Sequence, residues 1–158
     1  NGRLDARRWV IVTQRTTGDD TSLIERSAPK TWAYLTGHGA LLDGRKSSIY
    51  RKRPRFSVFG IGDYTFAPWK VAISGFYKSL KFALIPPFKG KPVMLDDTCY
   101  FLSFSSQQGA EDAVRGLNSG AAQDFFLSQV FWDTKRPITT DILERIDLDR
   151  LSVAIARA

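Results

Sequence analysis

The sequence predicts an α+β fold, with a mixed or antiparallel β-sheet in the N-terminal two thirds and helices in the C-terminal part. Short β-rich runs recur up to residue 104, and from Ser105 onward apolar residues repeat at helical intervals instead. Because the strands precede the helices rather than alternate with them, the order favours α+β over βαβ units. A length of 158 residues suits one domain. We therefore expect a single domain over 1–158, β-rich over 1–104 and helical over 105–158.

The N-terminal segment predicts one strand and one helix before an exposed connector. Trp9–Thr13 is rich in β-branched residues and predicts the first strand. Beyond it, Trp32, Leu35 and Leu42 lie at near-helical intervals, with Pro29 acceptable in the first turn. The polar and basic stretch 45–54 is expected to be exposed, and together with Arg55 it is called the connector, 45–55.

Five further runs of β-branched and aromatic residues predict the remaining strands. They are Phe56–Ile61, Trp69–Ser74, Lys81–Ile85, Pro92–Leu95 and Thr98–Phe104. The last run alternates Cys99 and Phe101 with Tyr100 and Leu102, which is the period-two pattern of a strand.

Three helices are predicted after residue 104. Ser105 precedes Gln108 by three residues, the spacing of a capping box, and the sequence Asn118-Ser119-Gly120 ends the first helix. The apolar stripes of the three helices are Ala110, Ala113, Val114 and Leu117; Ala122, Phe125, Phe126 and Val130; and Ile142, Leu143 and Ile146.

Positive charge is concentrated in the middle of the chain. The window 45–95 holds eleven lysines and arginines against one acid, Asp63, so its net charge is +10, whereas the whole chain carries +7. The same window contains ten of the twenty aromatic residues. A basic field interleaved with aromatic rings is typical of a surface that binds a phosphate backbone.

The connector is the predicted nucleic-acid-binding site. Arginine can read guanine with two donors, whereas lysine mainly anchors phosphate, and serine hydroxyls and aromatic rings can add contacts. The candidate residues are Arg45, Lys46, Ser47, Ser48, Tyr50, Arg51, Lys52, Arg53 and Arg55 in the connector, followed by Tyr64, Trp69, Lys70 and Lys78. Core packing is the interpretation preferred for Phe56, Phe59 and Phe66.

Two strings imitate catalytic motifs without their chemistry. The glycine-rich run 59–63 resembles a nucleotide loop, but Pro68 disfavours the helix that must follow such a loop. A tight glycine turn or a hairpin is expected there instead. The run 85–88 resembles the Asn/Asp-Pro-Pro-aromatic motif of amino-methyltransferases, but Ile85 has no polar group to hold an amine. No catalytic residue is assigned.

The chain offers few groups for metal or nucleophilic chemistry. Cys99 and His38 are its single cysteine and histidine, so no zinc cluster and no metal site is predicted. We expect His38 to be a surface or capping residue. A metal-dependent nuclease using Asp124, Asp133 and Lys135 stays open as an alternative, although Asp124 falls within a helical stripe rather than on a strand.

Several blocks together resemble a known family. They are Ser47–Tyr50, Pro54–Ser74, Met94–Leu102, Leu117–Ser119 with Phe125 and Phe126, and residues 142–148. Over about residues 27–150 the chain resembles the C-terminal target-recognition region of bacterial restriction–modification adenine-N6 DNA methyltransferases, of the TaqI-like or Eco57I-like type.

The resemblance implies a module that recognises double-stranded DNA for an upstream methyltransferase domain of the same polypeptide, with or without a fused endonuclease. That catalytic domain is expected to bind S-adenosylmethionine and to flip out an adenine. This fragment is expected to bind no cofactor and not to methylate. We expect a cytoplasmic protein without a membrane segment. A single-stranded nucleic-acid or protein interaction module is the remaining alternative.

Overall fold

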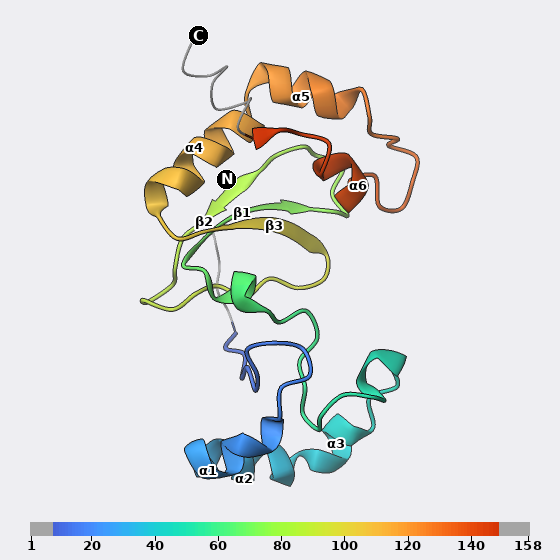
Figure 1. The fold of residues 1–158 in the computed structure, drawn as a ribbon. Coiled ribbons are helices and arrows are strands. Elements are labelled where there is room, and N and C mark those ends of the chain that lie inside the picture. Colours follow the sequence, from blue (N-terminus) through green and yellow to red (C-terminus); the bar gives the residue numbers. More distant parts are fainter. Residues whose placement is uncertain (1–7, 149–158) are drawn as a thin grey trace. The chain divides into compact units, whose positions relative to one another are not determined.

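The computed structural model describes residues 8–148 and has an α+β fold, which confirms the predicted class (Figure 1). Its contacts divide the chain into two compact units: an N-terminal unit, Arg8–Tyr64, and a C-terminal unit that begins at Thr65. The division falls at residue 64, whereas the sequence pattern changes from strand-like to helical at 105. That both units act as one domain stays a prediction.

The described part of the N-terminal unit is built from short helices. In chain order they are the 3₁₀ helix η1 (Thr21–Leu23), α1 (Ile24–Ser27), α2 (Pro29–Gly37), α3 (Gly39–Asp43) and the 3₁₀ helix η2 (Ser48–Tyr50); a further 3₁₀ helix, η3 (Asp63–Phe66), begins at the end of the unit. Pro29 begins α2, as its fixed φ allows. His38 separates α2 from α3 and contacts the Tyr34 carbonyl oxygen through Nδ1 at 2.8 Å, so the predicted capping role is confirmed.

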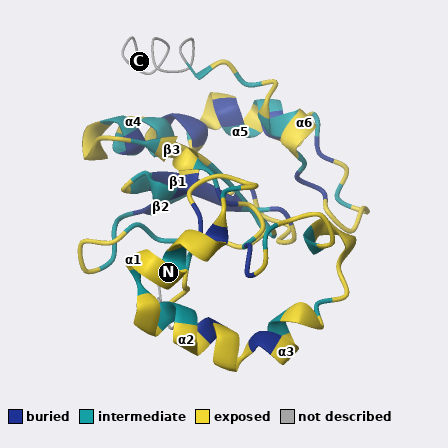
Figure 2. Ribbon diagram, turned by 60° about the horizontal axis from the view of Figure 1, so that its bottom comes forward, coloured by how far each residue is buried: buried dark blue, intermediate teal, exposed yellow. Residues whose placement is uncertain are grey.

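A small core holds the N-terminal unit together. Phe56, only 3% exposed, meets the Trp32 ring edge-on with the ring centroids 5.4 Å apart. Leu35 and Ile61 are buried as well. The helical spacing of Trp32 and Leu35 therefore does mark a core-facing side, although most of α2 is exposed (Figure 2).

The predicted strands Trp9–Thr13 and Phe56–Ile61 are wrong, because neither segment forms strand structure. Phe56 has a positive φ of 66° and Gly60 one of 72°, so the second segment is not extended throughout. Side chains at the end of the first segment and just after it bond the backbone of the second, where a pair of strands would use backbone groups on both sides. β-Propensity depends strongly on such tertiary context.

The C-terminal unit contains a three-stranded antiparallel sheet in the order β2-β1-β3. Its strands are β1 (Trp69–Ser74), β2 (Ala83–Ile85) and β3 (Cys99–Phe104). Val71 pairs with Leu84 on one side and with Leu102 on the other. Trp69–Ser74 matches its predicted bounds, and the other two strands lie inside the runs predicted for them. The predicted strand Pro92–Leu95 does not form; Pro92 has no N–H for a ladder, and Phe88 and Lys91 pair around a tight turn.

Helices α4 (Gln107–Leu117), α5 (Gly120–Leu127) and α6 (Thr140–Leu143) lie on one side of this sheet (Figure 1). The predicted stripes form the core of the unit: Ala110, Leu117, Ala122, Phe126 and Val130 are buried against Val71 and Ile73. Ser106, rather than the predicted Ser105, caps α4 by accepting from the Gly109 N–H at 3.2 Å.

One side-chain amide joins α4 to β2. Asn118 accepts from the Phe82 N–H at 3.0 Å through Oδ1 and donates to the Phe82 carbonyl at 2.9 Å through Nδ2. The carboxamide thus satisfies both backbone polar groups of one residue, as a neighbouring strand would. This pairing connects the end of the helix to the edge of the sheet.

Candidate nucleic-acid interface

The thirteen predicted DNA-binding residues are divided between the two units. Ten of them belong to the N-terminal unit: Arg45, Lys46, Ser47, Ser48, Tyr50, Arg51, Lys52, Arg53, Arg55 and Tyr64. Trp69, Lys70 and Lys78 belong to the C-terminal unit. The strongest concentration is in the N-terminal unit, where residues 8–64 carry ten cations against five acids.

The basic connector follows α3 and contains one turn of helix. Ser47 caps η2 by accepting from the Ile49 N–H at 3.4 Å, and further turns at Arg51 and Arg53 donate backbone N–H groups to Ser48 and Tyr50. The Ser47 hydroxyl therefore has a structural role. These turns present the intervening long side chains to solvent: Lys46, Arg51, Lys52 and Arg53 are all exposed.

The connector is anchored at its C-terminal end through four consecutive carbonyls. Thr21 donates its hydroxyl to the carbonyl of residue 55, Thr13 donates to that of residue 56 at 2.9 Å, and Gln14 donates to that of residue 58 at 3.0 Å. The carbonyl of residue 57 accepts from Arg45 at 2.7 Å. Gln14 also accepts from the Val58 N–H at 2.9 Å, so its carboxamide pairs with Val58 as Asn118 does with Phe82.

Arg45 is an internal brace rather than a free cation. Its Nε donates to the Leu42 carbonyl at the end of α3, 2.8 Å away, and its Nη1 reaches Ser57. The guanidinium also lies 3.8 Å from the centroid of the Tyr50 ring, a cation–π contact. A helix leaves its last carbonyls without helical partners, so this arginine satisfies one of them while it orders the connector.

Arg55 is paired with Asp43. Its Nε contacts both carboxylate oxygens at 3.1 Å, and its Nη2 lies 2.7 Å from Oδ2. Hydrogen bonding from Arg55 holds the pKa of Asp43 below its usual range. Gly39 leaves the space this arrangement needs, because a Cβ there would lie 2.5 Å from Arg55 Nη2. The pair is about half exposed, so it neutralises Asp43 without adding much stability.

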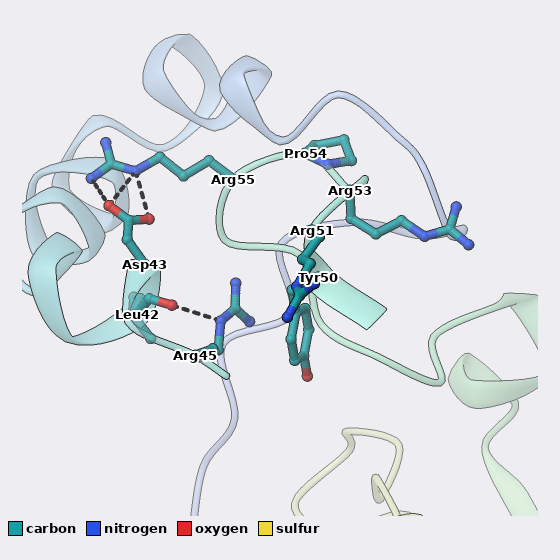
Figure 3. A pocket seen from close by; sticks show the side chains of 8 residues that line it. All are labelled: Leu42, Asp43, Arg45, Tyr50, Arg51, Arg53, Pro54 and Arg55. Atoms are coloured by element: carbon teal, nitrogen blue, oxygen red, sulfur yellow. Dashed lines mark hydrogen bonds and ion pairs between the residues drawn. The ribbon is translucent and has the colours of Figure 1, made fainter. Parts of the chain in front are cut away.

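These residues surround an open hollow of about 290 Å³ (Figure 3). Arg55 reaches toward Asp43, whereas Arg53 extends in the opposite direction and Arg51 lies beside Tyr50. The lining consists of Leu42, Asp43, Arg45, Tyr50, Arg51, Arg53, Pro54 and Arg55. The lining thus contains four arginines and one carboxylate, which is already paired with Arg55. Within residues 8–148, the side chains of Arg51 and Arg53 form no ion pair, so they are available to an anionic ligand.

The aromatic residues near the connector differ in exposure. Phe56 is buried, which confirms the core interpretation, whereas Phe59 is 55% exposed, so core packing is wrong for it. Tyr64 folds back over the glycine turn and donates its hydroxyl to the Gly60 carbonyl at 3.1 Å. A Cβ at Gly62 would lie 2.6 Å from the Tyr64 ring, which explains glycine there. The turn leads into η3, not into a hairpin.

The three candidates in the C-terminal unit have different environments. Trp69 is half-buried and packs against the core of the C-terminal unit, while Lys78 is exposed in the β1–β2 connection. Lys70 is fully buried, and its Nζ donates to the Ala67 carbonyl at 2.7 Å. Its ammonium is not on the surface, so Lys70 has no place in a DNA-contacting surface in this structure.

Burial of Lys70 makes a pH-dependent stability effect predictable. Desolvation lowers the pKa of Lys70 below its ordinary value of 10.5. As the pH rises through the lowered pKa toward 10.5, the folded state releases a proton that the unfolded state still holds, and stability therefore increases. We expect the free energy of unfolding of wild type to rise relative to that of Lys70→Met in this window. Urea denaturation at neutral and alkaline pH measures the difference, and parallel profiles of the two proteins would contradict it.

Nothing in the described residues supports metal chemistry. Over 8–148, no three His, Cys, Asp or Glu side chains gather where they could hold a metal ion. Asp124 lies on α5, whereas Asp133 and Lys135 lie in the loop that follows, and all three are exposed. The nuclease alternative therefore has no geometric observation in its favour.

Sequence reasoning missed the residues that hold the connector in place. Thr13, Gln14 and Thr21 precede it by more than twenty residues, and nothing in their local pattern identifies their partners. A weak signal was present: Thr13 and Gln14 interrupt an apolar run with polar side chains that the structure buries. Asp43, the acid in the hollow, was overlooked because it lies just outside the basic window.

The helices described over 8–148 lack the combination of length and hydrophobicity that crossing a bilayer requires. The cytoplasmic location stays a prediction.

Comparison with known proteins relates the chain to one class of enzyme. It is 52% identical over 148 residues to the type II methyltransferase M.NspV of Nostoc sp. (strain ATCC 29411 / PCC 7524). The match covers 94% of this chain but 31% of that protein, so the chain spans about a third of its relative's length. No protein-family model matches the sequence, and no solved structure does either. The chain is thus similar, over nearly all of its length, to one portion of a type II methyltransferase.

Proposed function

We propose that this chain is the target-recognition module of an adenine-specific DNA methyltransferase, which binds duplex DNA and positions it for a catalytic domain elsewhere in the same polypeptide. In this proposal the catalytic domain binds S-adenosylmethionine and transfers the methyl group. The module contributes affinity and sequence selectivity, and it performs no chemistry of its own.

The observation that carries the proposal is the exposed cationic group of the connector. Lys46, Arg51, Lys52 and Arg53 are exposed and, within the described residues, form no ion pair. They lie on a segment whose end is held by four carbonyl contacts. Anchoring of the backbone beside these cations reduces the conformational entropy lost when they meet phosphates, which favours binding.

Similarity to a type II methyltransferase over almost the entire chain supports the same assignment. A portion that lacks catalytic candidates still serves such an enzyme if it holds the DNA. Phosphate contacts fix the orientation of the duplex, and contacts with base edges provide selectivity.

Salt-dependent binding of the full-length protein to labelled duplex tests the proposal. If the four free cations each contact a phosphate, log affinity should fall with log salt concentration with a slope of about −3.6. If all six connector cations contacted phosphates, the slope would be roughly −5. We expect the shallower slope because Arg45 and Arg55 already have partners within the protein. Absence of salt-sensitive duplex binding at low ionic strength would overturn the proposal.

A single-strand-binding module is the second candidate, favoured by the exposed ring of Phe59. Bases that are splayed from a single strand can stack on such rings without sequence preference. Competition binding separates the two functions. For a duplex recognition module, unlabelled duplex displaces labelled duplex at lower concentration than single strands of the same sequence do. The reverse order would favour the second candidate.

A further inference from the structure

A second, smaller hollow adjoins the arginine-lined one in the N-terminal unit. The two share Tyr50 and Arg53 as walls. The remaining lining of the second hollow is Gln14, Thr17, Ile49, Ser57, Val58 and Phe59. A charged hollow and a largely uncharged one therefore lie side by side on the same anchored segment.

The polar side chains of the second hollow donate hydrogen bonds to backbone carbonyls of the N-terminal unit. Gln14 uses both carboxamide atoms on Val58. Ser57 donates its hydroxyl to the Pro54 carbonyl at 2.6 Å, and Thr17 donates to the Ile61 carbonyl at 3.4 Å. These bonds use the hydroxyl hydrogens of Ser57 and Thr17 and one of the two amide hydrogens of Gln14.

What the second hollow offers to a ligand is apolar surface. Ile49 is 44% exposed and Phe59 is 55% exposed. Large apolar side chains that remain open to water beside a cationic surface favour a ligand with an apolar group next to an anion. Arg53, on the shared wall, is the free donor at the boundary between the two hollows.

We propose that the second hollow receives the C5-methyl group of a thymine, read in the major groove while Arg51 and Arg53 hold the adjacent backbone. The inference rests on the proposed function. In the major groove of unmodified duplex DNA, the thymine methyl is the apolar feature that distinguishes one base pair from the others. Ile49 and Phe59 are then specificity-determining residues, and Arg45 and Arg55 are positioning residues.

Removing the methyl group from DNA tests this inference. Selection from randomised duplexes with the full-length protein first gives the preferred sequence. Each thymine in it is then replaced singly by uracil, which keeps every hydrogen-bonding group, and dissociation constants are measured at fixed salt. We expect one position to weaken binding about fourfold, the effect of withdrawing one buried methyl group.

Variants connect the effect to the hollow. Phe59→Ala should bring the uracil-to-thymine ratio of dissociation constants at that position close to one. Phe131→Ala is the matched control, because Phe131 is 77% exposed in the C-terminal unit, and it should keep the fourfold ratio. Arg53→Ala should weaken binding to both duplexes and leave the ratio in place.

The outcomes separate the two proposals. Tight, sequence-selective duplex binding that no uracil substitution weakens overturns the methyl site and leaves the recognition module standing. A selected sequence without thymine, or a fourfold ratio that survives Phe59→Ala, overturns it as well. If Phe59→Ala weakens thymine and uracil duplexes equally, the ring stacks on a base instead. Failure to bind any duplex removes the proposed function, and the methyl site with it.

Discussion

Simultaneous replacement of Arg51 and Arg53 by alanine is expected to weaken duplex binding by the full-length protein on the order of 100-fold. Both guanidinium groups are exposed beside the hollow and have no internal ion pair among the described residues. Each should release about one counterion on binding, so the slope of log affinity against log salt should become shallower by about 1.8. Fluorescence anisotropy over a salt series measures both quantities.

A matched pair of cations provides the control. Arg26 and Lys30 are exposed on α1 and α2 of the same unit, and Arg26→Ala/Lys30→Ala makes the same change in charge. It should leave the slope nearly unchanged. Asp43→Asn changes the charge in the opposite direction and releases Arg55 from its partner, so it should steepen the slope by about 0.9. If the Arg51→Ala/Arg53→Ala and Arg26→Ala/Lys30→Ala variants lose the same affinity, binding depends on net charge alone and not on the connector.

Gln14→Met is expected to destabilise the N-terminal unit by about 2–4 kcal/mol. Methionine has a similar volume but cannot form the two hydrogen bonds to Val58, so a half-buried N–H and a half-buried carbonyl lose their partners. Hydrogen exchange at the Val58 amide reports the loss directly, because Gln14 is the acceptor of that hydrogen. Denaturation by urea gives its magnitude.

The control for this change is Gln107→Met. Gln107 is exposed on α4 and donates to Glu111 at 2.7 Å, a contact that water can replace. Its loss should change stability by no more than about 0.5 kcal/mol. If exchange at Val58 is as slow in Gln14→Met as in wild type, the carboxamide does not anchor the connector.

The C-terminal unit was largely predictable because its signals are local. β1 carries a compact run of β-rich residues, and the apolar residues of α4 recur at i, i+3, i+4 and i+7 on the face that the structure buries. The N-terminal unit was not predictable in this way. Its segments 9–13 and 56–61 have strand-like composition, but side chains such as that of Gln14, 44 residues away from Val58, take the place of a neighbouring strand.

The candidate site was predictable only in part for the same reason. Six cations within eleven residues are visible in the sequence, because they are neighbours along the chain. Which of them are free is decided by tertiary contacts: Arg45 meets Ser57 and Arg55 meets Asp43, each twelve residues away. Burial of Lys70 likewise depends on what covers the sheet, and its alternating strand position does not reveal this.

The side chains that anchor the connector bind backbone carbonyl oxygens, and this has a consequence for its redesign. Every amino acid supplies the same carbonyl, so the bonds from Thr13, Gln14, Thr21 and Arg45 do not depend on which side chains occupy 46–54. That stretch can therefore change in sequence while the contacts to the carbonyls of residues 55–58 stay in place. Under the proposed function, grafting the corresponding stretch of a relative onto the same backbone contacts is expected to change which DNA sequence the protein prefers.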